Sequence, residues 1–121
     1  MKLAGSRLSS DSIVLVEWRD DGQSSPERPI AGLHVHRSDD EAWYVLEGRL
    51  GFRIGAEVVE AGPGEAVLAP RGVPHSYWNA SEGLTRYLLV GPPRLFALID
   101  ELHRGGGDWA AIFRKYDSEL L

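Results

Sequence analysis

The chain has 121 residues, of which 43% are hydrophobic and 26% charged, and its net charge is −5 at neutral pH. These values indicate one globular domain with its own core rather than a disordered chain. The sequence contains no cysteine, which excludes disulfides, thiolate metal sites and cysteine nucleophiles, and its scattered basic residues do not predict nucleic-acid binding.

Short β-prone runs separated by turn residues occupy most of the chain. Fourteen glycines and seven prolines are spread along it, which favours many short elements over a helical bundle. We expect eight strands, at residues 13–18, 31–36, 42–47, 50–54, 57–60, 66–69, 75–79 and 84–90. Strands of this length and spacing predict an all-β sandwich or barrel.

The last thirty residues show helical periodicity instead. Pro93 can open a helix whose apolar positions are Leu95, Leu98, Ile99 and Leu102. Residues 105–107 are glycines that end this helix, and Asp108 is a suitable N-cap for a second one. We therefore expect a single domain over residues 1–121. Its barrel should span about 13–90, with a helical tail at about 93–117 that packs outside the barrel or in a subunit interface.

Three histidines and one glutamate are the clearest candidates for chemistry. His34 and His36 lie two residues apart in an expected strand and so point to one face. Glu41 opens the next strand, and His75 opens a later one. If the inward faces converge, these side chains can surround one ion of Mn, Fe, Co, Ni, Cu or Zn, whereas Ca and Mg prefer oxygen ligands. A six-coordinate ion would keep two positions for a substrate. A His-x-His pair alone is more often structural.

Two segments resemble the motifs of a known superfamily. HVHRSDDEAWYVLEG, from His34 to Gly48, is similar to the first cupin motif: His-x-His, three or four residues, Glu, six residues, Gly. GEAVLAPRGVPHSYWN, from Gly64 to Asn79, matches the second, Gly-x5-Pro-x-Gly-x2-His-x3-Asn, at every fixed position. The one departure is Arg28, where the first motif usually opens with glycine, and it affects the entry loop rather than the ligands.

The resemblance implies a cupin double-stranded β-helix, or jelly-roll barrel, followed here by the short helical tail. It also implies a divalent transition metal inside the barrel, held by His34, His36, Glu41 and His75, and commonly a homodimer. It does not fix the activity, because cupins include dioxygenases, isomerases, epimerases, decarboxylases, sensor domains and storage proteins.

Our leading hypothesis is a metal-dependent, dioxygenase-like oxidoreductase that acts on a small, largely apolar or aromatic molecule. Glu41 would be a ligand and a base, and Tyr77, which shares the parity of His75, would donate a hydrogen bond to a metal-bound ligand. Trp43 and Phe52 are further candidates for the substrate pocket, with core packing as the alternative. A non-catalytic binding or sensing cupin and a metal-assisted isomerase remain open, although no separate base inside the barrel can be named for an isomerase.

Other residues inform on solvent exposure, subunit contacts and cellular location. Arg86 on the last strand is expected to face solvent, and His103 fits a solvated histidine in the last turn of the tail helix. The first strand is apolar on both faces, so we expect it to contact a second subunit in a homodimer. No apolar run reaches the roughly 18 residues of a membrane span, and residues 1–12 lack the apolar stretch of a secretory signal. We therefore expect a cytoplasmic protein.

Overall fold

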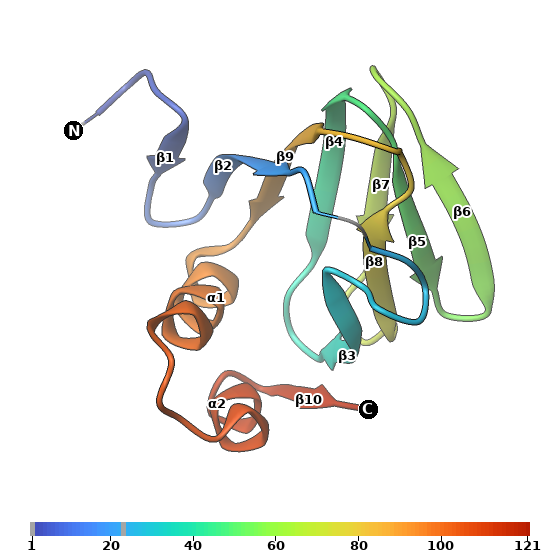
Figure 1. Cartoon of the computed structure of the whole chain (residues 1–121). Helices are drawn as coiled ribbons and strands as arrows, with labels where there is room; N and C mark the ends of the chain where they lie inside the picture. The colour runs from blue at the N-terminus through green and yellow to red at the C-terminus, as the bar shows by residue number, and fades with distance from the viewer. Residues whose placement is uncertain (1, 23) are drawn as a thin grey trace.

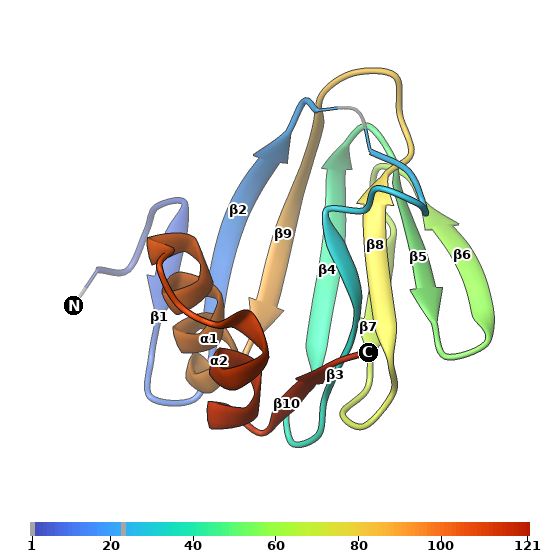
Figure 2. The ribbon, with the colours of Figure 1, turned by 60° about the horizontal axis from the view of Figure 1, so that its bottom comes forward.

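The computed structural model describes residues 2–22 and 24–121. Within them, two five-stranded antiparallel sheets face each other, with strand orders β1-β2-β9-β4-β7 and β10-β3-β8-β5-β6 (Figures 1 and 2). The strands are β1 (Arg7–Ser9), β2 (Val14–Asp20), β3 (Ala31–His36), β4 (Glu41–Glu47), β5 (Leu50–Ile54), β6 (Glu57–Ala61), β7 (Ala66–Ala69), β8 (His75–Asn79), β9 (Thr85–Gly91) and β10 (Ser118–Leu120). The all-β jelly-roll prediction is confirmed.

All eight expected strands are present, with boundaries within two residues of the predicted ones. The structure adds two three-residue strands, β1 and β10, at the edges of the sheets. Their sequences, RLS and SEL, are too short and too polar for a strand pattern. They are strands because each lies in register with a longer neighbour, β2 and β3 respectively.

The core lies between the sheets and is built from alternate strand positions. Trp43 and Val45 of β4, Phe52 of β5, and Tyr87 and Leu89 of β9 are all at most 2% exposed. Because side chains alternate across a strand, these positions place one face of each sheet inward. The buried apolar surface therefore stabilises the closed barrel.

The tail contains α1 (Pro93–Arg104) and α2 (Trp109–Lys115), as expected. Pro93 opens α1, and the Asp108 side chain accepts a 3.0 Å hydrogen bond from the Ala110 N–H at the start of α2. The chain then returns to the barrel through β10, which pairs with β3 (Figure 2). Among the described residues, no helix has the length and hydropathy of a membrane span.

Candidate metal centre

Four buried side chains meet inside the barrel: His34 and His36 from β3, Glu41 from β4 and His75 from β8. None is more than 6% exposed, and one ligand atom from each lies within 4.8 Å of all the others. Two ligands on opposite sides of an ion with bonds of about 2.1 Å are about 4.2 Å apart. The cluster therefore has the dimensions of a metal site after adjustments of a few tenths of an ångström.

Strand pairing explains why these residues converge. The i, i+2 spacing puts His34 and His36 on one face of β3, and the register of β3 with β8 sets His34 opposite His75. Glu41 is the first residue of β4, in the facing sheet. Its Oε1 lies 3.0 Å from His75 Nε2 and 3.5 Å from His36 Nε2. The cluster thus joins the two sheets.

A hydrogen bond at Nδ1 orients each of the three imidazole rings. His34 Nδ1 lies 2.5 Å from the Gly32 carbonyl, and His75 Nδ1 lies 3.2 Å from the Val73 carbonyl. His36 Nδ1 lies 2.7 Å from Ser118 Oγ. A carbonyl only accepts, so Nδ1 of His34 and of His75 carries a proton, and in the neutral ring the free lone pair is on Nε2. This arrangement is typical of histidines that bind a metal, and the donor set of three nitrogens and one carboxylate fits a first-row transition ion.

The electrostatics of the cluster favour the same protonation states. Burial raises the pKa of the Glu41 carboxyl, but the hydrogen bonds that His36 and His75 donate to it when both nitrogens of their rings carry a proton outweigh burial and lower the pKa to about 2. Burial, together with the positive charges of His75 and His36, lowers the pKa of His34 to about 4. At neutral pH the carboxylate is therefore ionised and His34 is neutral, as metal binding requires.

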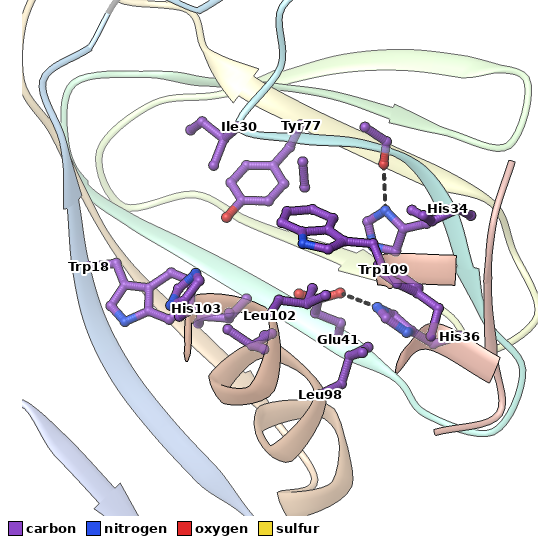
Figure 3. Close-up of a pocket in the computed structure, with 16 residues that line it drawn as sticks. Trp18, Ile30, His34, His36, Glu41, Tyr77, Leu98, Leu102, His103 and Trp109 are labelled. Atoms are coloured by element: carbon purple, nitrogen blue, oxygen red, sulfur yellow. Dashed lines mark hydrogen bonds and ion pairs between the residues drawn. The ribbon is translucent and has the colours of Figure 1, made fainter. Parts of the chain in front are cut away.

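A cavity of about 150 Å³ opens beside the cluster (Figure 3). Three of the four cluster residues, His34, His36 and Glu41, line it together with mostly apolar side chains. The barrel contributes Trp18, Ile30, Ala31, Gly32, Tyr77 and Leu89, and the tail contributes Leu98, Ile99, Leu102, His103, Trp109, Phe113 and Leu120. The helical tail is thus a wall of the cavity, and not simply a cover on the outside of the barrel as the sequence suggested.

The structure separates the three aromatic pocket candidates. Tyr77 lines the cavity, its hydroxyl lies 3.0 Å from that of Tyr87, and burial raises its pKa well above the usual value. Trp43 and Phe52 face inward, but neither is among the described residues that line the cavity. Their rings pack against each other at 5.0 Å, and Trp43 lies 5.7 Å from the His75 ring. Both therefore belong to the core beneath the cluster.

The two residues expected to lie outside the site have different surroundings. Arg86 faces away from the core, where it pairs with Glu17 at 3.0 Å and Glu47 at 3.6 Å. His103 is exposed in the last turn of α1, as expected, yet it also lines the cavity beside Trp18, with 5.7 Å between their rings (Figure 3). The cavity therefore has one titratable side chain, His103, on the tail side.

A β-barrel with this internal cluster is the arrangement of a metal-binding cupin. The family model described as a cupin domain matches residues 23–91, more than half of the chain, and the chain therefore belongs to the cupin family.

Known proteins with similar chains include one from Streptomyces coelicolor, described as uncharacterized, which is 30% identical over 61% of this chain and 64% of its own. The polyketide cyclase RemF from Streptomyces resistomycificus is 34% identical, with a TM-score of 0.53 over 69% of this chain and 56% of that one. KdgF from Halomonas sp. has a TM-score of 0.61 at 17% identity, over 77% of this chain and 85% of that one. The chain thus spans less than two thirds of the first two proteins.

Proposed function

We propose that this cupin is a metal-dependent enzyme with dioxygenase-like oxidoreductase chemistry on a small, largely apolar or aromatic molecule. One observation carries the proposal: a buried cluster with the donor set of a transition metal borders an apolar cavity. A ligand in that cavity would place its polar end at the cluster and its apolar part against α1 and α2.

The size of the cavity limits the ligand. Its volume is about 150 Å³, similar to that of an engineered apolar cavity that binds benzene. A space of this volume fits about one six-membered ring, and a larger substrate would extend out of the cavity. Two adjacent oxygen atoms on the ring would suit an ion that keeps two positions open.

The side chains around the cavity have distinct roles in this proposal. A bound first-row transition ion would supply Lewis-acid and redox chemistry. Glu41, ionised at neutral pH, would hold the ion and accept a proton from the substrate. Tyr77 keeps its proton because its pKa is raised, and Tyr87 can be the donor in their 3.0 Å pair. That arrangement leaves the Tyr77 hydroxyl free to donate to a substrate oxygen, while the apolar wall excludes water.

A metal-assisted isomerase or cyclase is the second candidate. The sequence offered no base besides the ligands, but His103 on the cavity wall is a side chain that can move a proton. The likeness to the polyketide cyclase RemF, at 34% identity, also supports a cyclase. The third possibility, a binding or sensing cupin, predicts ligand binding without turnover.

Oxygen uptake by protein loaded separately with iron, manganese or nickel distinguishes these functions. The probes are catechols and β-diketones, which carry two neighbouring oxygens on a small frame. Oxygen consumed in proportion to substrate supports the dioxygenase, whereas product formed under argon and lost in His103→Ala supports the isomerase or cyclase. Binding without product supports the sensor. The matched control is Leu102→Trp, which fills the cavity and should abolish probe binding without changing the metal content.

We also propose that the protein is a cytoplasmic homodimer. The outer face of the sheet that contains β2, β9 and β4 has an apolar region beside the Arg86–Glu17 ion pair, and two large side chains of this region, Tyr44 and Leu68, are 42% and 56% exposed. The strand registers place them on one face with four more apolar residues: Leu15, Ala42, Leu88 and Val90. A second copy of the chain could cover this face, which includes the strand expected to contact another subunit.

A further inference from the structure

The C-terminal strand reaches the metal cluster. In the pairing of β10 with β3, Ser118 lies opposite His36, and Ser118 is only 1% exposed. Its hydroxyl oxygen lies 2.7 Å from His36 Nδ1. Ser118 lies outside residues 23–91, which match the cupin family model.

The direction of this hydrogen bond follows from the second contact of the hydroxyl group. Ser118 Oγ donates to the Tyr116 carbonyl at 3.2 Å, because a carbonyl can only accept. Its oxygen therefore accepts the proton on His36 Nδ1. The lone pair of His36 is then on Nε2, the atom that faces Glu41 Oε1 at 3.5 Å (Figure 3).

His36 differs from the other two histidines in the origin of its partner. His34 and His75 bond to carbonyls two residues earlier in their own segments, so local backbone geometry orients them. His36 depends on a residue 82 positions away. Without that residue, Nδ1 of His36 has no hydrogen-bond partner among the described atoms, and no contact at Nδ1 selects the tautomer.

The tail contacts both the His36 ring and the strand β3, beside which Ser118 lies. Phe113 of α2 stacks on the His36 ring, with 6.3 Å between centroids and an interplanar angle of 6°. Backbone hydrogen bonds join Arg37 to Asp117 and Leu121 to Leu33, each at 3.0 Å. The position of Ser118 is therefore set by the docked tail as a whole.

We propose that Ser118 is a positioning residue for the metal ligand His36, so that the C-terminal strand is a functional part of the metal centre. This inference rests on the proposed metal function. It has a consequence for that function: the tail that lines the cavity also orients a ligand, which couples substrate access to metal binding.

Zinc binding by Ser118→Ala, measured by competition with a chelator, tests this role. Loss of a hydrogen-bond partner behind a ligand typically lowers metal affinity by about 10–100-fold, and we expect this loss. Ser118→Thr keeps the hydroxyl group and should bind zinc more tightly than Ser118→Ala. The matched control is Ser76→Ala, because Ser76 is also buried in this sheet but makes no hydrogen bond to a cluster imidazole among the described residues.

Long-range ¹H–¹⁵N NMR of ¹⁵N-histidine protein reads the tautomer of the wild type directly. In zinc-loaded wild type, His36 should carry its proton on Nδ1, and the exchange of that proton with water should accelerate in Ser118→Ala but not in Ser76→Ala. A His36 proton on Nε2, or unchanged zinc affinity in folded Ser118→Ala, overturns the role of Ser118 while the metal centre stands. Wild-type protein that binds no zinc refutes the metal centre itself, and this role with it.

Discussion

Replacing His75 by alanine removes one anchor of the cluster. His75 comes from β8, whereas the other three ligands come from β3 and the start of β4. The substitution also removes the imidazole 3.0 Å from Glu41 Oε1, so the buried carboxylate loses one of its two histidine partners. We expect His75→Ala to lose most of its metal affinity, because only three of the four ligands remain and none of them comes from β8.

The effect on thermal stability follows because an ion that binds only the folded state stabilises it. An ion at about 100 times its Kd stabilises the folded state by about 2.7 kcal/mol. Since the entropy of unfolding is about 2.1 cal/mol/K per residue, a chain of 121 residues should melt about 11 °C higher with the ion than with chelator. Loss of a direct ligand should raise the Kd at least about 100-fold, so the gain for His75→Ala falls to about 2 °C at the same ion concentration.

The assay is thermal melting of each protein with and without chelator, so that each variant is its own reference. His103→Ala is the matched control, because His103 lines the cavity but does not belong to the four-residue cluster. It should keep the full metal-dependent gain. The assignment is wrong if His75→Ala keeps that gain, or if His103→Ala loses it.

Three further predictions concern stability and assembly. Burial lowers the pKa of His34 to about 4 in the folded protein, so the unfolded chain binds this proton at a higher pH than the folded chain does. The free energy of unfolding of the metal-free protein should therefore fall by about 3 kcal/mol as the pH drops from 6.5 to 4. Urea midpoints that do not change over this range contradict the prediction. Gly51→Ala should lower the free energy of unfolding, measured by urea denaturation, by about 1–3 kcal/mol. The new Cβ would lie 2.2 Å from Trp78 Nε1, which is a steric clash. Gly83→Ala, with nothing within 4 Å, should shift stability by at most about 1 kcal/mol, and equal midpoints for the two variants refute the clash. Light scattering should give a dimer for the wild type and the 13.4 kDa monomer for Leu68→Glu, whereas a wild-type monomer at tens of micromolar contradicts the dimer.

The sequence predicted the barrel from short-range patterns, and it predicted the four cluster residues from those patterns together with the resemblance to the two cupin motifs. His34 and His36 share a face whenever residues 31–36 form a strand, and Glu41 follows after one turn. The alternation that places Trp43 and Phe52 inward is equally local. However, alternation shows only that a side chain points inward, and not whether it lies near the cavity. Both residues lie in the core and do not line the cavity.

The cavity wall could not be predicted because it depends on where the tail docks. The apolar spacing of α1 and α2 indicated a buried face but not the surface that it covers. His103 was recognised as an exposed residue in a last turn, while its place beside Trp18 follows only from the packing of α1. Ser118 gives no signal in sequence, since a serine in a polar three-residue strand becomes significant only through its register with β3.

Anomalous scattering from a crystal of zinc-loaded, untagged protein tests the central claim most directly. We predict one strong peak per chain, about 2.0–2.2 Å from Nε2 of His34, His36 and His75 and from the carboxylate of Glu41. The absence of a peak among these side chains, or a zinc ion at His103 instead, would contradict it.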